Sequence, residues 1–189
     1  MQAGKGNAAK WVWLALGMLF SPVQPGGAQA PVAETFTLDE AADALAIGRA
    51  AYEDGLFDLS RRRLEELVEK APDRRRRAEG AIWLARVSLA QGKPDAALAM
   101  LQQVSEVRAI SLLAELALTR AQAYAAKGDW KTVALELAPF QERFVGQSNA
   151  PVALHLLVHM LAAEQKWEEA RQAILLLEDR YPEHPETVA

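Results

Sequence analysis

A pattern that recurs four times constrains the fold of this chain more than any other sequence feature. In its clearest copy, between Tyr124 and Leu137, one helical segment ends, Gly128 forms a turn, and a second amphipathic segment begins at Trp130. The corresponding turn positions lie 37, 36 and 37 residues apart and are Gly55, Gly92, Gly128 and Gln165. Such regular spacing predicts an array of helical hairpins, each packed on the next.

The composition favours an all-α protein, and no sequence motif indicates enzymatic chemistry. Alanine and leucine dominate, no long stretch alternates with a period of two, and 51% hydrophobic residues suffice for a buried core in 189 residues. The net charge of −4 does not favour nucleic acid. The absence of cysteine excludes disulfides and thiol catalysis. Since no phosphate-binding loop or catalytic constellation is recognisable, we expect a non-enzyme that needs no cofactor.

Residues 1–30 have the three parts of a secretory signal peptide. Lys5 and Lys10 precede an apolar core at 11–20, and small residues allow cleavage after Ala28 or Ala30. This core is 10 residues long, whereas a membrane-spanning helix needs about 20. We therefore expect a periplasmic or secreted protein. The alternative is an uncleaved segment that anchors the chain in the inner membrane.

The remaining chain divides into a linker at 31–38, a repeat domain at 39–182 and a C-terminal tail at 183–189. We expect eight helices in four pairs: 39–54 with 56–70, 73–91 with 94–105, 107–127 with 130–145, and 150–165 with 167–181. Asp39 and Asp73 can cap helix starts. Pro139 should kink its helix. Glycine readily adopts the left-handed turn conformation, so the turn at Gln165 should be looser or shifted.

Two kinds of residue recur at fixed places in the repeats and predict how the helices pack. Small residues occupy one position in each helix, which allows close crossing; they are Gly48, Ala85, Ala121 and Val158, and Ser60, Ala97, Val133 and Ala170. Large apolar residues follow in the second helices at Leu64, Leu101, Leu137 and Ile174. We expect the aromatic residues that begin three second helices, Phe57, Trp130 and Trp167, to lie in the core.

These features resemble tetratricopeptide repeats. The shared features are a small residue in the first helix, a glycine and an aromatic residue at the turn, a small residue three positions later, and a terminal Pro72 or Pro182. The resemblance implies a right-handed α-solenoid of about four repeats that serves as a protein-interaction scaffold. Pro94 and Gln165 depart from the pattern. The ending at 178–185 is similar to repeats of bacterial envelope proteins.

The resemblance also implies where a partner binds, because the first helices of this family line a concave face. The family spacing puts on that face Leu45, Arg49, Tyr52, Ile82, Arg86, Leu89, Leu118, Gln122, His155 and His159. Arginine and tyrosine often dominate interfaces, so an extended peptide or partner helix with acidic groups is the preferred ligand. A solvated surface without a partner is the simpler interpretation. A membrane-tethered accessory subunit of an envelope assembly or translocation complex is the alternative function.

Two further clusters are candidates for binding. His155 and His159 have the spacing of a two-imidazole metal site, but no third ligand is evident, so we expect no metal. Arg61 and Arg62 should pair with Glu65 and Glu66 along their helix. The second cluster is Arg74, Arg75, Arg76 and Arg77. It could contact anionic lipid headgroups or an acidic protein, although a solvated helix start also explains it.

Overall fold

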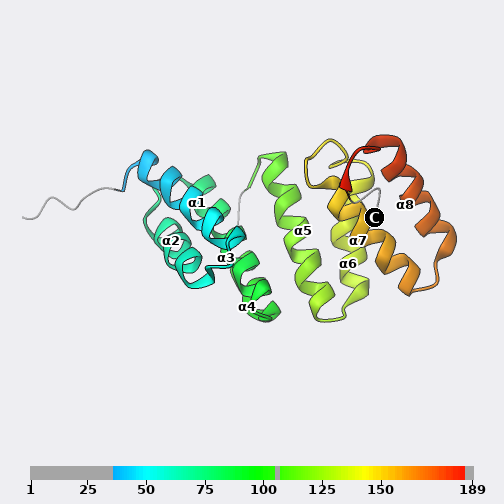
Figure 1. The fold of residues 1–189 in the computed structure, drawn as a ribbon, viewed down its shortest axis with the longest axis horizontal. Helices are drawn as coiled ribbons and strands as arrows, with labels where there is room; N and C mark the ends of the chain where they lie inside the picture. The colour runs from blue at the N-terminus through cyan, green and yellow to red at the C-terminus, as the bar shows by residue number, and fades with distance from the viewer. Residues whose placement is uncertain (1–35, 105–106, 186–189) are drawn as a thin grey trace, which may run out of the picture. The chain divides into compact units, whose positions relative to one another are not determined.

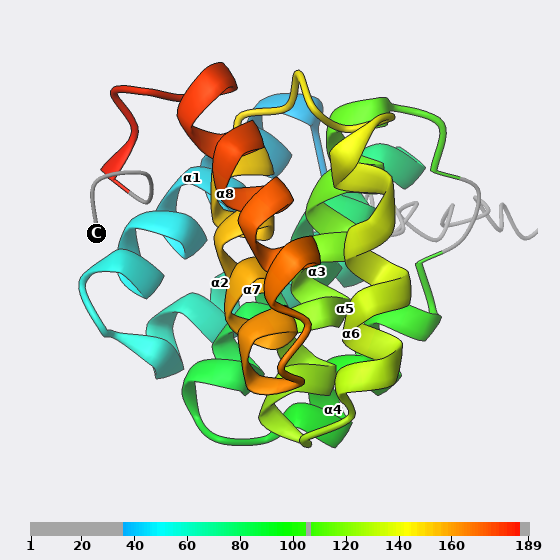
Figure 2. The same ribbon diagram turned by 90° about the vertical axis from the view of Figure 1, so that its right-hand side faces the viewer.

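The computed structural model describes residues 36–104 and 107–185, so the predicted signal peptide, most of the predicted linker and most of the predicted C-terminal tail lie outside the described residues. The described residues form an all-helical fold in which helices follow one another in chain order (Figures 1 and 2). The elements are α1 Leu38–Glu53, α2 Phe57–Lys70, α3 Arg74–Ala90, α4 Pro94–Gln102, α5 Ile110–Ala126, α6 Trp130–Leu137, the 3₁₀ helix η1 Ala138–Gln141, α7 Ala150–Ala163 and α8 Trp167–Arg180. The predicted all-α class with eight α-helices is thus confirmed.

The four turns within the helix pairs have the same hydrogen bonds. In the third, Gly128 has a φ of 74° and the Asp129 amide donates to the Tyr124 carbonyl at 3.0 Å. In the fourth, Gln165 has a φ of 61° and the Lys166 amide donates to the Leu161 carbonyl at 2.9 Å. This pattern is the Schellman motif that closes a helix C-terminus. The prediction of a looser or shifted turn at Gln165 is therefore wrong, because the backbone of this glutamine adopts the left-handed conformation.

Several helix ends differ from the sequence prediction by a few residues, and two of the differences have a clear local cause. Thr37, rather than Asp39, caps α1, and its capping box is completed by the Glu40 side chain. Helix α6 ends at Leu137, and Pro139 lies in η1 instead of kinking a longer helix. Proline cannot donate the backbone hydrogen bond that would continue the α-helix. The expected cap at Asp73 is confirmed, since its carboxylate accepts the Arg76 amide at 2.8 Å.

The small-residue positions allow the paired helices to cross closely, as expected. A Cβ atom added to Gly48 would lie 2.7 Å from the side chain of Leu64, so only glycine fits there without a shift. The Ser60 hydroxyl donates to the Gly48 carbonyl at 2.7 Å in the same crossing. In later repeats alanine serves the same purpose, and Ala85 and Ala97 are fully buried. A larger side chain would separate the helix axes.

The prediction that the turn aromatics lie in the core is wrong for two of the three. Phe57 is partly buried and its ring lies 5.9 Å from that of Tyr52. Trp130 and Trp167 are exposed. Ile174 is also exposed, although Leu64, Leu101 and Leu137 at the same repeat position are buried. No helix follows α8 within the described residues, so nothing described there covers its outer side.

The apolar core forms as linked clusters along the chain. One cluster joins α1, α2 and α3, the next joins α3, α4 and α5, and the last joins α5 to α8 together with η1. Tyr124 packs against both of the last two clusters. Each repeat therefore depends mainly on its neighbours for burial. Within the described residues no helix is long and apolar enough to cross a membrane.

Candidate interaction surface

Side chains from three first helices meet on one surface because α1 packs against α3 and α3 packs against α5. Arg49 and Tyr52 come from α1, Trp83 and Arg86 from α3, and Glu115 from α5. On each of α1 and α3 the two residues are three positions apart, about one helical turn. We call these five residues the aromatic-cationic cluster.

The indole of Trp83 is the centre of the cluster. The guanidinium carbon of Arg86 lies 4.4 Å from the centroid of this ring, and that of Arg49 lies 5.0 Å from it. Tyr52 meets the same indole edge-on, with ring centroids 5.5 Å apart. Both cations are therefore within the distance at which an aromatic ring attracts them. These contacts restrict the movement of the two arginine side chains.

The cluster contains more positive than negative charge. Arg86 Nη2 lies 3.5 Å from Glu115 Oε2, and the Arg86 side chain is only 18% exposed. Burial lowers the pKa of Arg86, while Glu115 acts in the opposite direction and the nearby Arg49 lowers it further. Arg49 is exposed and takes part in no ion pair within 4.0 Å among the described residues. The cluster thus contains two guanidinium groups and one carboxylate, and this carboxylate pairs with Arg86.

Not every residue predicted for this surface is accessible. Leu45, Ile82 and Leu118 occupy the same repeat position and are buried in the three apolar clusters. They stabilise the helix packing instead of forming an accessible apolar floor. Leu89 is partly buried against the core. Gln122 is partly buried at the repeat position of Arg49 and Arg86.

The two predicted histidines lie apart from the cluster. Both histidines lie on α7, which packs mainly against α6, η1 and α8. The contact between α7 and α5 is smaller than the contact between α3 and α5. The Nε2 atoms of His155 and His159 are 2.6 Å apart, so one ring nitrogen donates to the other. No group of three or more metal-ligating residues occurs in the described part of the chain. The structure does not bring these imidazoles together with Arg49 and Arg86.

The arginine runs pair largely within their own helices. Arg61 contacts Glu65 at 4.0 Å as expected, but Glu66 pairs with Arg63 and Lys70 at 3.2 and 3.1 Å, rather than with Arg62.

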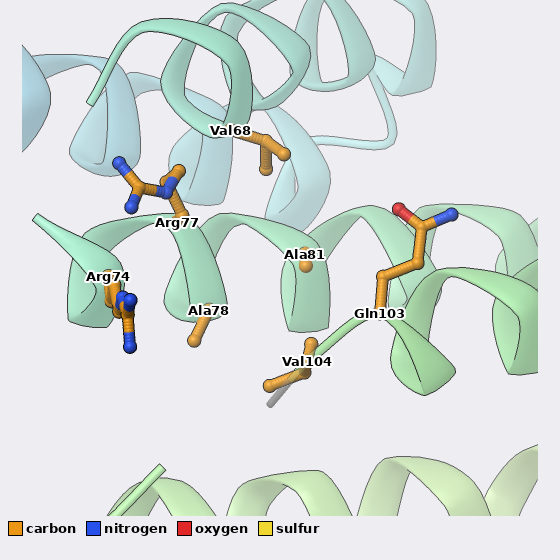
Figure 3. Close-up of a pocket in the computed structure, with 7 residues that line it drawn as sticks. All are labelled: Val68, Arg74, Arg77, Ala78, Ala81, Gln103 and Val104. Atoms are coloured by element: carbon orange, nitrogen blue, oxygen red, sulfur yellow. The ribbon is translucent and has the colours of Figure 1, made fainter. Parts of the chain in front are cut away.

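In the second run, Arg75 and Arg76 bind Glu79 at 2.9 and 2.8 Å, and Arg77 donates to the Ala71 carbonyl at 2.5 Å. Arg74 and Arg77 also line a cavity of about 330 Å³ together with Val68, Gln103 and Val104 (Figure 3). We assign this cavity no role. Contact of this run with lipid stays a prediction.

Two residues of the cluster were missed by reasoning from the sequence. Trp83 lies three positions before Arg86, so helical spacing alone could have placed it on the same surface. Glu115 contacts Arg86 from another helix, and no local pattern indicates that pair. Long-range contacts of this kind depend on the crossing of α3 and α5.

Comparison with known proteins supports the repeat assignment for the first part of the chain. Residues 37–117 match the family described as tetratricopeptide repeat-like domain. The match begins at the cap of α1 and ends within α5, and thus includes all five residues of the aromatic-cationic cluster. No curated protein and no solved structure matches the chain. The chain therefore contains a tetratricopeptide repeat-like domain, a class that generally binds proteins.

Proposed function

We propose that this protein is a non-enzymatic interaction scaffold that binds an acidic peptide or an acidic partner helix at the aromatic-cationic cluster. The repeat-like domain supports a protein partner in general. The observation that supports an acidic one is that two guanidinium groups lie near the Trp83 ring, whereas the cluster contains one carboxylate, Glu115, and that carboxylate pairs with Arg86. A carboxylate of the partner would supply the missing negative charge.

The cluster is suited to binding because its side chains are already held in place. Holding Arg49 against Trp83 reduces the conformational entropy that a flexible arginine would lose on binding. A guanidinium group can donate two parallel N–H hydrogen bonds to the two oxygens of a carboxylate. Tyr52 adds a rigid ring of the kind that contributes strongly at interfaces. An acidic residue next to an apolar or aromatic residue is the preferred sequence of the ligand.

We further propose that the scaffold acts in the periplasm or outside the cell, after removal of the N-terminal segment. The support is the charged, apolar and small-residue order of residues 1–30. Measuring the mass of the protein isolated from cells tests this. A mass lower by 28 or 30 N-terminal residues is expected, whereas an intact N-terminus would favour the membrane-tethered accessory subunit.

Pull-down from periplasmic extract followed by crosslinking tests the binding surface. Arg49→Gln with Tyr52→Ala should remove a partner that the unchanged chain captures, because Arg49 is exposed and Tyr52 is only partly buried against the first apolar cluster. Arg62→Gln, which changes an exposed arginine on α2, is the matched control and should retain the partner. Retained binding after substitution of Arg49, Tyr52 and Arg86 together would exclude this surface. Circular dichroism checks that each variant is folded.

A further inference from the structure

Two imidazole rings meet on the accessible side of α7. The ring centroids of His155 and His159 lie 4.5 Å apart, with an angle of 48° between the ring planes. The two Nε2 atoms are 2.6 Å apart. Two nitrogen lone pairs that face each other at this distance repel, so a proton or a metal ion has to lie between them. The arrangement therefore suits a shared cation as well as the hydrogen bond.

The position of His155 is apolar in the other three first helices. Leu45, Ile82 and Leu118 occupy it there and are buried in the apolar clusters. His155, by contrast, is only partly buried. It therefore does not serve the packing that this position serves in the other repeats, and a different role is open to its imidazole.

The backbone of α7 holds the two rings in a fixed relation. The helix is continuous over Ala150–Ala163, and its opposite side is buried in the last apolar cluster through Leu154, Leu157 and Met160. Side chains four positions apart in a helix lie on the same side. This is the spacing at which two histidines of one helix bind the same metal ion. Since the nitrogens already converge, binding requires little ordering of the side chains.

The distance between the two nitrogens favours copper. An imidazole nitrogen binds a divalent ion such as zinc at about 2.0–2.1 Å. Two such ligands at a right angle, as in square-planar coordination, are about 2.9 Å apart, and two in a tetrahedral arrangement are about 3.4 Å apart. The Nε2 separation of 2.6 Å is nearer to the right-angle value. Among the divalent first-row metals, Cu²⁺ both prefers this geometry and binds nitrogen ligands most tightly.

Copper requires no further protein ligand at this place. Across residues 36–104 and 107–185, no group of three or more histidine, cysteine, aspartate or glutamate side chains could hold a metal ion. The expectation of no metal from the sequence rested on this missing third ligand. Two imidazoles, with water at the other positions of a square-planar ion, nevertheless provide the nitrogen and oxygen ligands that Cu²⁺ prefers.

We propose that His155 and His159 form a binding site for one divalent copper ion, held by both Nε2 atoms and otherwise coordinated by water. The proton between the rings moves to Nδ1 of its own ring by exchange with water. Both rings then stay neutral, and each presents an Nε2 lone pair to the metal. The site uses no residue of the aromatic-cationic cluster, so it is independent of the function proposed above.

Isothermal titration calorimetry of the full chain with Cu²⁺ measures the affinity. The tightest site should hold one ion per chain. His155→Ala and His159→Ala should each weaken this binding at least tenfold, because a single imidazole loses the advantage of two linked ligands. Alanine favours the helix, so both variants should fold, and circular dichroism checks this. His184→Ala, which changes the third histidine of the chain, is the matched control and should leave the binding unchanged.

Electron paramagnetic resonance identifies the ligands of the first equivalent of Cu²⁺. The unchanged chain should show coupling to two imidazole nitrogens, and His155→Ala or His159→Ala should reduce this to one. The same equivalent should raise the Tm of the unchanged chain and of His184→Ala but not of the other two variants, because only the folded helix holds the two nitrogens together.

Four results would overturn the proposal: no saturable binding, unchanged binding in His155→Ala or His159→Ala, equal weakening by His184→Ala, or coupling to a single nitrogen in the unchanged chain. A titration with Zn²⁺ tests the choice of metal. Zinc should bind more weakly than copper, and equal or tighter binding of zinc would overturn the assignment to copper.

Discussion

The N-terminal half, α1 to α4, and the C-terminal half, α5 to α8, combine the same turn geometry with different surfaces. In the N-terminal half α1 and α3 approach closely and place two guanidinium groups on one indole. In the C-terminal half α7 packs mainly against α6, η1 and α8, and its polar surface residues are two histidines in contact with each other. The difference arises partly from the connection at 138–149, which adds the buried rings of Phe140 and Phe144 to the C-terminal core.

This comparison separates what builds the array from what selects a partner. The turn hydrogen bonds recur in all four pairs, including the pair outside the residues matched by the family. Side chains at one repeat position, by contrast, change from Arg49 and Arg86 to Gln122 and His159 along the chain. The turn hydrogen bonds therefore determine the repeat fold, whereas the surface side chains differ from one repeat to the next and determine what each repeat can bind.

The largest effect should come from a charge buried at an internal crossing. Ala97→Asp places a carboxylate at a fully buried site between helices of the N-terminal half. We expect a loss of roughly 3 kcal/mol or more, since an unpaired buried charge must be desolvated or must disrupt the packing. Urea unfolding followed by circular dichroism measures the change.

Ala170→Asp is the matched change in the C-terminal half. It should cost less, because α8 packs mainly against α7 and a shift of this last described helix disturbs fewer neighbouring helices than a shift of α4. Equal losses at the two sites would contradict the difference between an internal and a terminal repeat. Hydrogen exchange should show the N-terminal half opening first in the Ala97 variant, while α7 and α8 keep their protection.

A smaller loss should follow from Gly48→Ala. The added Cβ atom would lie 2.7 Å from the Leu64 side chain, and overpacking of this kind typically costs about 1 to 3 kcal/mol. Gly146→Ala in the C-terminal half meets nothing within 4 Å and is the control. The double variant Gly48→Ala with Leu64→Ala should lose less unfolding free energy than the sum of the losses of the two single variants. Additive losses would show that the close crossing is not the cause.

Sequence reasoning predicted the turns and buried repeat positions well because they follow local rules. The turn at Gly128 depends on residues a few positions apart, and the burial of Ala97 at an interhelical contact follows from the recurrence of small residues at its repeat position. The exposure of Trp167 could not be predicted in this way, because it depends on the absence of a covering helix in the described structure. The Arg86–Glu115 contact likewise depends on how α3 and α5 cross. The site was therefore only partly predictable.

The fourth turn offers a stabilising change. Gln165 has a φ of 61°, a conformation that costs a side-chain-bearing residue about 1 kcal/mol relative to glycine. Gln165→Gly should raise the free energy of unfolding by about 0.5 to 1 kcal/mol, because the larger entropy of glycine in the unfolded chain offsets part of the gain. Gly128→Ala should lower it by a similar amount. Thermal melting of both variants measures the changes, and a destabilised Gln165→Gly protein would show that the glutamine makes a compensating contact.

The smallest effect should distinguish an ion pair within the C-terminal half, Arg120–Glu136, from the ion pair that joins the two halves, Arg86–Glu115. Burial raises the pKa of Glu136, and Arg120, whose Nε lies 3.2 Å from the carboxylate, only partly opposes this. A raised pKa means that the folded state favours the protonated carboxyl more than the unfolded state does. The resulting stability is present below the unfolded pKa and is lost as the pH rises through the folded pKa.

Glu136→Gln, which mimics the neutral form, should therefore make the protein slightly more stable at neutral pH, with the advantage disappearing in acid. Glu115→Gln should have the opposite sign, since it leaves the largely buried Arg86 without its carboxylate, at a cost of a few tenths of a kcal/mol because Glu115 is 38% exposed. Urea unfolding at neutral and acidic pH measures both variants. If both substitutions destabilise at neutral pH, Arg120 pairs with the Glu136 carboxylate well enough to offset its burial, and the two ion pairs do not differ as expected.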